Sequence, residues 1–246
     1  MEPLALLLGA GLVAGAMNAI AGGGSFVSFP ALVFAGLPPV VANATNTVAL
    51  LPGTLASAWA YRDGMTGFGG LPLRVLLPVT LAGGLLGAAL LLVTPDSTFR
   101  AVVPWLLLLA TLVFAGGREL VHWLRGSVHI GKGPVLVAQF LIAIYGGYFG
   151  GAVGLMMMAV WSLFDTADLK AMAPARTLLT SAANGLAAVC FVLAGAVRWP
   201  EMLAMMGGVV AGGYLGALGA RLVPARVIRG AVVVLCAGVT VWFFRG

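Results

Sequence analysis

Charged residues are scarce in this chain of 246 residues: Asp, Glu, Lys and Arg together make up 8% of it, against about 25% in soluble domains. None of the four occurs between Glu2 and Arg62. Hydrophobic residues make up 61%, and a water-soluble domain of this size cannot bury so much apolar surface. The composition therefore excludes a soluble fold and predicts an all-α polytopic membrane protein.

The residues that usually carry catalysis or bind metals are also rare. Cys190 and Cys236 lie inside apolar runs, which indicates core positions rather than a disulfide or a metal pair. His122 and His129 have no other ligand types nearby, and all seven acids lie near the ends of apolar runs or in loops. We find no HExxH motif, paired carboxylates, nucleotide-binding loop or basic patch interleaved with aromatics. We therefore expect no enzyme, no metal, no cofactor and no nucleic-acid partner, and any transport should be secondary.

A glycine cluster, Gly22-Gly23-Gly24-Ser25, stands inside the longest uncharged run. Such glycines either permit close helix packing or break a helix, and a following serine suited to capping favours a break. Backbone freed at membrane depth must be covered by protein or line a cavity. The run 133–164 is long for one crossing and contains Gly146, Gly147, Gly150, Gly151 and Gly154, so it predicts a second broken element.

The two halves of the chain repeat. The segment Ala82–Ala88 (AGGLLGA) reappears as Ala211–Ala217 (AGGYLGA), an offset of 129. Further upstream the offset is 131, which aligns Thr45 with Arg176. We assign 1–117 to a first repeat, 118–133 to a cytoplasmic connecting loop and 134–246 to a second repeat of one integrated domain.

Basic residues predict how these repeats are oriented. If every element crosses the membrane, the 13 basic residues divide seven to six, against the usual cytoplasmic excess. If 3–36 and 134–165 are re-entrant hairpins, each followed by three transmembrane helices, the division is ten to three. The sequence therefore predicts two inverted repeats with both chain ends outside.

Polar side chains inside the apolar runs concentrate just after the two breaks. Four helix starts, near residues 24, 43, 155 and 174, are expected to aim free amides at one central point, which would suit an anion. For each Asn or Thr the alternative is ordinary interhelical hydrogen bonding. Arg176 is either a cation in the site or a loop residue at the cytoplasmic edge. The candidate substrate-binding residues are Asn18, Gly22, Gly23, Gly24, Ser25, Asn43, Thr45, Asn46, Gly154, Arg176, Thr177 and Ser181.

Three segments carry a family resemblance: GAMNAIAGGGSFVSFP at 15–30, LPPVVANATN at 37–46, and the later copy at 163–177. The chain resembles the sulfite exporter TauE/SafE family of membrane transporters over almost its whole length. The second copy departs from the pattern, because Gly154-Leu155-Met156 replaces a fuller glycine cluster.

The resemblance implies movement of small sulfur-containing anions, such as sulfite or organosulfonates, across the bacterial inner membrane. The alternatives are a passive anion channel and a transporter of a non-sulfur organic anion. The expected partners are a small anionic substrate and the lipid bilayer. A homodimer and a coupling ion, proton or sodium, are compatible with the sequence, which selects neither.

Overall fold

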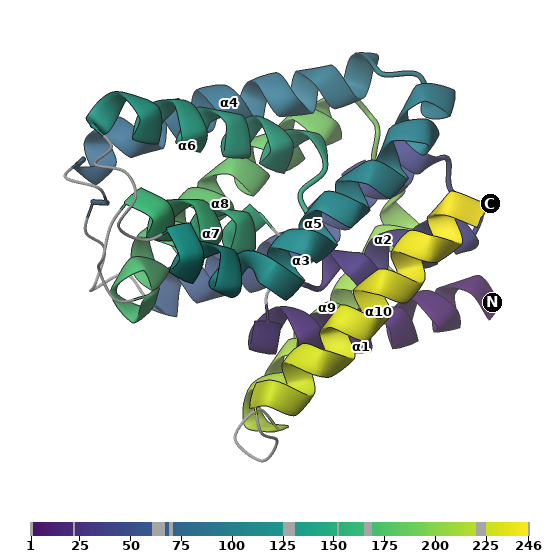
Figure 1. Cartoon of the computed structure of the whole chain (residues 1–246). Helices are drawn as coiled ribbons and strands as arrows, with labels where there is room; N and C mark the ends of the chain where they lie inside the picture. Colours follow the sequence, from purple (N-terminus) through teal and green to yellow (C-terminus); the bar gives the residue numbers. More distant parts are fainter. Residues whose placement is uncertain are drawn as a thin grey trace.

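The computed structural model describes residues 2–21, 23–60, 67–68, 71–124, 131–151, 153–164, 169–219 and 225–245. Within these ranges the chain is almost entirely helical, without β-strands, and it forms α1 to α10 (Figure 1). Three described stretches are long and apolar enough to cross a membrane: 73–93, 96–113 and 174–193. The prediction of an all-α membrane protein is therefore confirmed.

Each half contains a broken pair of helices followed by three longer ones. The first half comprises α1 (Glu2–Ala21), α2 (Ser25–Phe34), α3 (Pro39–Ala60), α4 (Leu73–Val93) and α5 (Asp96–Leu124). The second half comprises α6 (Lys132–Tyr148), α7 (Val153–Phe164), α8 (Leu169–Leu193), α9 (Trp199–Gly219) and α10 (Ala225–Arg245). Both predicted breaks are present, since α1 is separated from α2 and α6 from α7.

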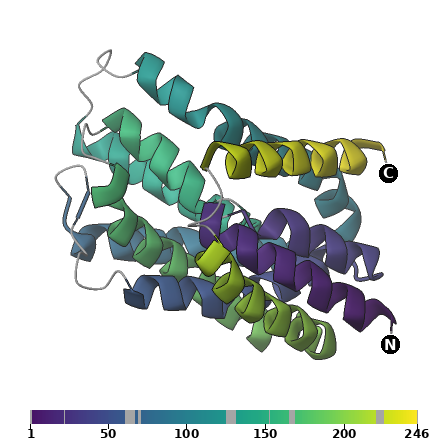
Figure 2. The ribbon, with the colours of Figure 1, turned by 90° about the horizontal axis from the view of Figure 1, so that it is seen from below.

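The two broken pairs enter the bundle from opposite ends. In Figure 1 the start of α1, the end of α2 and both chain ends lie toward the right, whereas α6 begins and α7 ends toward the left. Figure 2 shows from below that the N- and C-termini share one end. This arrangement favours the inverted-repeat interpretation, whose orientation in a membrane stays a prediction.

The halves pack reciprocally, and small residues at the repeated positions form the contacts. α1 of the first half packs on α9 of the second, and α6 of the second packs on α4 of the first. A methyl group added at Gly87 would meet the backbone of Gly147 at 3.0 Å, and one at Gly216 would meet Ala16 Cα at 2.5 Å. These two contacts are equivalent in the repeat, because Gly216 follows Gly87 by 129 residues and Gly147 follows Ala16 by 131 residues.

Two boundary predictions are corrected by the helix bounds. α3 begins at Pro39 and α8 at Leu169, so Asn43 and Pro174 lie inside helices and not at helix starts. The residues 118–124 of the predicted connecting loop continue α5, and α6 begins at Lys132. Prolines within apolar helices are tolerated because neighbouring helices satisfy the freed backbone groups, so they mark a boundary poorly there.

Candidate functional site

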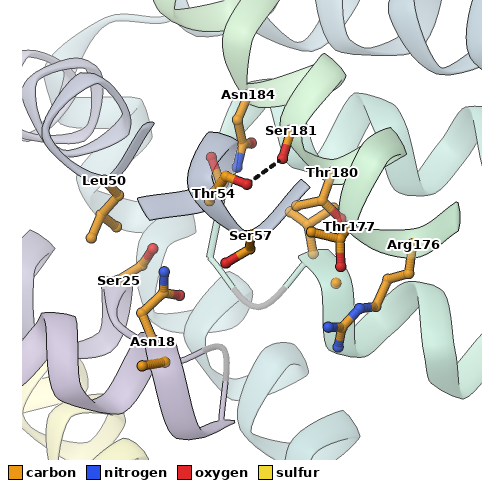
Figure 3. A pocket seen from close by; sticks show the side chains of 14 residues that line it. Asn18, Ser25, Leu50, Thr54, Ser57, Arg176, Thr177, Thr180, Ser181 and Asn184 are labelled. Atoms are coloured by element: carbon orange, nitrogen blue, oxygen red, sulfur yellow. Dashed lines mark hydrogen bonds between the residues drawn. The ribbon is translucent and has the colours of Figure 1, made fainter. Parts of the chain in front are cut away.

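A cavity of about 170 Å³ lies where the two breaks face the middle of α3 and α8. One water needs only roughly 15 Å³ of such space, so a small anion fits together with several waters. The lining residues come from both halves (Figure 3): Asn18, Ala19, Ser25, Leu50, Thr54, Ser57, Gly150, Val153, Gly154, Arg176, Thr177, Thr180, Ser181 and Asn184.

Helix α8 provides one polar face of the cavity. Arg176, Thr177, Thr180, Ser181 and Asn184 recur at intervals of three and four residues, which places them on the same side of a helix. The Ser181 hydroxyl donates to the Thr54 carbonyl at 2.9 Å, the contact drawn dashed in Figure 3. This bond fixes α8 against α3 at the cavity wall.

Arg176 lies eight residues into α8 and is half-buried, so it is not a loop residue. Its side chain extends toward the cavity beside Thr177 (Figure 3). Among the described residues that line the cavity, it is the one with a formal charge. A guanidinium carries a positive charge, and its N–H donors lie in a planar fork.

The first break contributes the start of α2. Ser25 is buried and lines the cavity, and the amides of Phe26 and Val27 donate to the carbonyls of Gly23 and Gly24. Earlier amides of a helix have no acceptor within it, so the positive end of α2 lies at the cavity. Ser25 is the first helical residue and Gly24 the N-cap, without a capping side-chain bond, so the expected serine cap is not formed.

Gly24 also serves close packing, which was the alternative interpretation of the glycine cluster. A Cβ atom at this position would come within 2.6 Å of the Ala14 carbonyl oxygen and 3.0 Å of Asn18 Cβ. Gly23 is buried beside it, and neither glycine lines the cavity. Gly22 lies outside the described residues.

The second break is formed by a glycine turn. Gly150 has φ +75°, a left-handed backbone conformation that residues other than glycine rarely adopt. This turn lets α6 end and α7 begin beside the cavity. Gly154 leaves room for Arg176, whose Cδ would lie 3.5 Å from a Cβ at that position. The start of α7 therefore adds a second helix N-terminus to the site.

Packing of the break residues holds both N-termini in place. The ring of Phe29 in α2 meets that of Phe149, which follows α6, edge to face at 5.7 Å. Trp161 of α7 donates to the buried Gln139 of α6 at 3.0 Å and stacks on Phe68. Because the rings and Gln139 are fully or nearly fully buried, the short helices α2 and α7 are fixed relative to the longer ones.

Three predicted residues on α3 lie outside the cavity lining. The Thr45 hydroxyl accepts a hydrogen bond from the Arg198 amide at 3.1 Å, and Asn43 donates to the Tyr148 carbonyl at 2.9 Å. Asn46 is 1% exposed and does not line the cavity. The structure therefore places at the cavity six of the twelve predicted residues: Asn18, Ser25, Gly154, Arg176, Thr177 and Ser181.

Four polar lining residues were not among the predicted site residues: Thr54, Ser57, Thr180 and Asn184. Thr54 and Ser57 lie two turns or more beyond the cluster that follows the first break, so proximity to a break does not identify them. The usable signal is their helical spacing, since Thr47, Leu50, Thr54 and Ser57 recur on one face of α3.

Comparisons with known proteins give consistent results. A family model described as Sulfite exporter TauE/SafE matches residues 7–243. A probable membrane transporter protein of Sinorhizobium sp is 31% identical over 94% of this chain and 88% of its own length. Probable membrane transporter proteins of Haemophilus influenzae and Escherichia coli K12 (YfcA) are each 30% identical, over 96% and 95% of this chain and 92% and 87% of their own lengths. No solved structure matches the chain.

Proposed function

Because this chain belongs to the sulfite exporter TauE/SafE family of membrane transporters, we propose that it is a secondary transporter for small sulfur-containing anions, of the sulfite or organosulfonate kind. It acts by binding and release across the bacterial inner membrane and not by catalysis. The substrate is held in the cavity between the two breaks.

One observation carries the proposal: among the described residues, one cationic side chain and two helix N-termini face a cavity lined by hydroxyl and amide groups. Arg176 supplies the charge, and the starts of α2 and α7 supply backbone amides and the positive ends of two helix dipoles. A sulfite or sulfonate group offers three oxygens to donors that converge from different directions. Guanidinium and amide donors to an ionised oxygen form the stronger, charge-assisted class of hydrogen bond.

The placement of the site also suits alternating access. The cavity wall combines α1, α2 and α3 of the first half with Gly150 of the α6–α7 turn, α7 and α8 of the second. Transporters built from two repeats commonly bind substrate at the repeat interface, next to discontinuous helices. A rocking motion of one half against the other would then expose the same residues to each side in turn.

The test is a binding and exchange experiment on purified protein. We expect sulfite and methanesulfonate to raise the melting temperature more than acetate does at equal ionic strength. Reconstituted protein should exchange labelled sulfite for unlabelled sulfite at a rate that saturates with concentration. Absence of stabilisation by every anion tested would contradict the site, and a conductance that does not saturate would support a passive channel instead.

A further inference from the structure

Two buried carboxamide oxygens lie on α3, on the turns before the cavity. Asn43 and Asn46 are each 1% exposed, and within the described residues the Oδ1 atom of each accepts no hydrogen bond. Leaving one such oxygen unsatisfied costs about 1–3 kcal/mol, so two together call for a ligand. Residues three apart on a helix lie on neighbouring turns of one face, which brings the two side chains next to each other.

The orientation of the Asn43 amide follows from its partner. Its Nδ2 donates to the Tyr148 carbonyl at 2.9 Å, and a carbonyl only accepts, so the nitrogen is identified and Oδ1 is the unpartnered atom. Tyr148 is the last residue of α6. The Asn43 side chain therefore lies at the C-terminal end of a broken helix, where the helix dipole is negative and favours a positive charge.

A third oxygen belongs to Thr47. Its hydroxyl donates to the Asn43 carbonyl at 2.9 Å, which leaves the oxygen lone pairs to accept from or coordinate a ligand. The Thr47 oxygen would lie 3.5 Å from a Cβ at Gly150, so the same turn that borders the anion cavity borders this cluster. Asn43, Asn46 and Thr47 are called the α3 oxygen cluster below.

We propose that the α3 oxygen cluster binds a sodium ion, and that this ion is coupled to the anion in the neighbouring cavity. The coupling rests on the proposed function, whereas the ion site stands on its own geometry. Carboxamide and hydroxyl oxygens are ligands for hard cations, and a neutral set at the negative end of a helix suits a monovalent one. A proton would need a titratable group, and none of the three side chains titrates.

Proximity of opposite charges explains the coupling. Gly150 lines the cavity, and a Cβ at this position would lie 3.5 Å from the Thr47 hydroxyl oxygen of the α3 oxygen cluster. A cation bound on one side attracts an anion bound on the other, and the attraction is stronger in a protein interior than in water. Because binding linkage is reciprocal, bound sodium should raise the affinity for the anion, and the bound anion should raise the affinity for sodium by the same factor.

The test begins with the protein alone, in sodium, potassium or choline chloride at constant ionic strength. We expect the melting temperature to rise saturably with sodium and not with potassium. Asn46→Ala should abolish this sodium response, and Asn46→Asp, which adds a charge to the cluster, should lower the sodium concentration at half effect. Thr45→Val is the matched control, because Thr45 is equally buried on α3 but bonds Arg198, and it should keep the response.

The second measurement is anion affinity, which should rise at least threefold when sodium replaces choline. The proposal is overturned if the wild type does not respond to sodium, or responds to potassium as strongly as to sodium. It is also overturned if the sodium response survives in Asn46→Ala or disappears in Thr45→Val. If anions still stabilise the protein in choline, the proposed function survives that failure. If sodium stabilises the protein but no anion does, the ion site survives and the transported substrate is wrong.

Discussion

Arg176 is the residue on which the electrostatics of the site depend. A charged side chain within a membrane protein is costly unless a partner or a wet cavity compensates, and Arg176 borders a polar cavity. Its neighbours on the same face, Thr177 and Thr180, add hydroxyl groups to the cavity lining without adding charge. Under the proposed function, the guanidinium gives the cavity its preference for anions.

We predict that Arg176→Ala weakens anion binding at least tenfold, because a hydrogen bond to a charged group contributes about 1.5–3 kcal/mol and every 1.4 kcal/mol is tenfold in affinity. Arg176→Lys should restore little, since an ammonium group lacks the planar fork. Calorimetric titration with sulfite measures the effect, and the melting temperature without ligand reports on folding.

Arg74→Ala is the control for this prediction, because Arg74 is exposed in the first turn of α4 and does not line the cavity. It should bind sulfite as the wild type does. Equal affinities of Arg176→Ala and the wild type would remove Arg176 from the site, which would then depend on the backbone amides of α2 and α7 and on the hydroxyl groups.

Individual cavity-lining residues were predictable where a polar side chain interrupts an apolar run after a break. Ser25, Arg176 and Ser181 meet this criterion and line the cavity. Thr45 meets the same criterion, yet it does not line the cavity, and its hydroxyl accepts a hydrogen bond from the Arg198 amide instead. The sequence gives the depth of a polar residue along a helix, but the direction it faces depends on which helices pack around it.

At the scale of elements, the paired short helices α2 and α7 bring backbone amides to the cavity, and close packing of α1 and α6 holds them. α1 packs on α9 and α6 on α4 through glycines, whose absent side chains allow backbone contact. Gly83 and Gly212 occupy equivalent positions of the repeated AGG motif, and each lies in one of these two contacts. The starts of α3 and α8 were not predicted, because Pro174 suits a first helical turn and is also tolerated inside α8.

We predict that Gly216→Leu destabilises the fold instead of selectively reducing anion affinity. A Cβ at Gly216 would meet Ala16 Cα at 2.5 Å and Ala16 Cβ at 3.0 Å, so α1 and α9 would have to separate. Gly207→Leu on the same helix is the control, because Gly207 is exposed and has open space around its Cα. Thermal melting and expression level measure the effect, and an unchanged melting temperature in Gly216→Leu would contradict the packing argument.

At the scale of the whole molecule, contacts between equivalent positions relate the two halves. The hydroxyl oxygens of Thr111 on α5 and Thr240 on α10 lie 3.2 Å apart, and the two residues differ by 129, the offset of the repeated motif. Two equivalent residues touch only where they lie at an axis that relates the halves. The offset was visible in the sequence, whereas the position of the axis required the packed helices.

The orientation of this arrangement in the membrane gives the last prediction. The basic residues divide ten to three between the two ends of the bundle when the hairpins are re-entrant, and the richer end should face the cytoplasm. Gly131, before α6, belongs to the richer end, and Ser97, in the first turn of α5, belongs to the other. Both are exposed, so each accepts a cysteine without disturbing the packing.

In a background in which Cys190 and Cys236 are replaced, an impermeant thiol reagent applied to intact cells should label Ser97→Cys and leave Gly131→Cys unlabelled. Permeabilised cells should show labelling of both, which controls for reactivity. Labelling of Gly131→Cys alone in intact cells would reverse the assignment of the two sides. Labelling of both positions would place them on one side and contradict the odd number of crossings per half, and the inverted relation of the repeats would then be wrong.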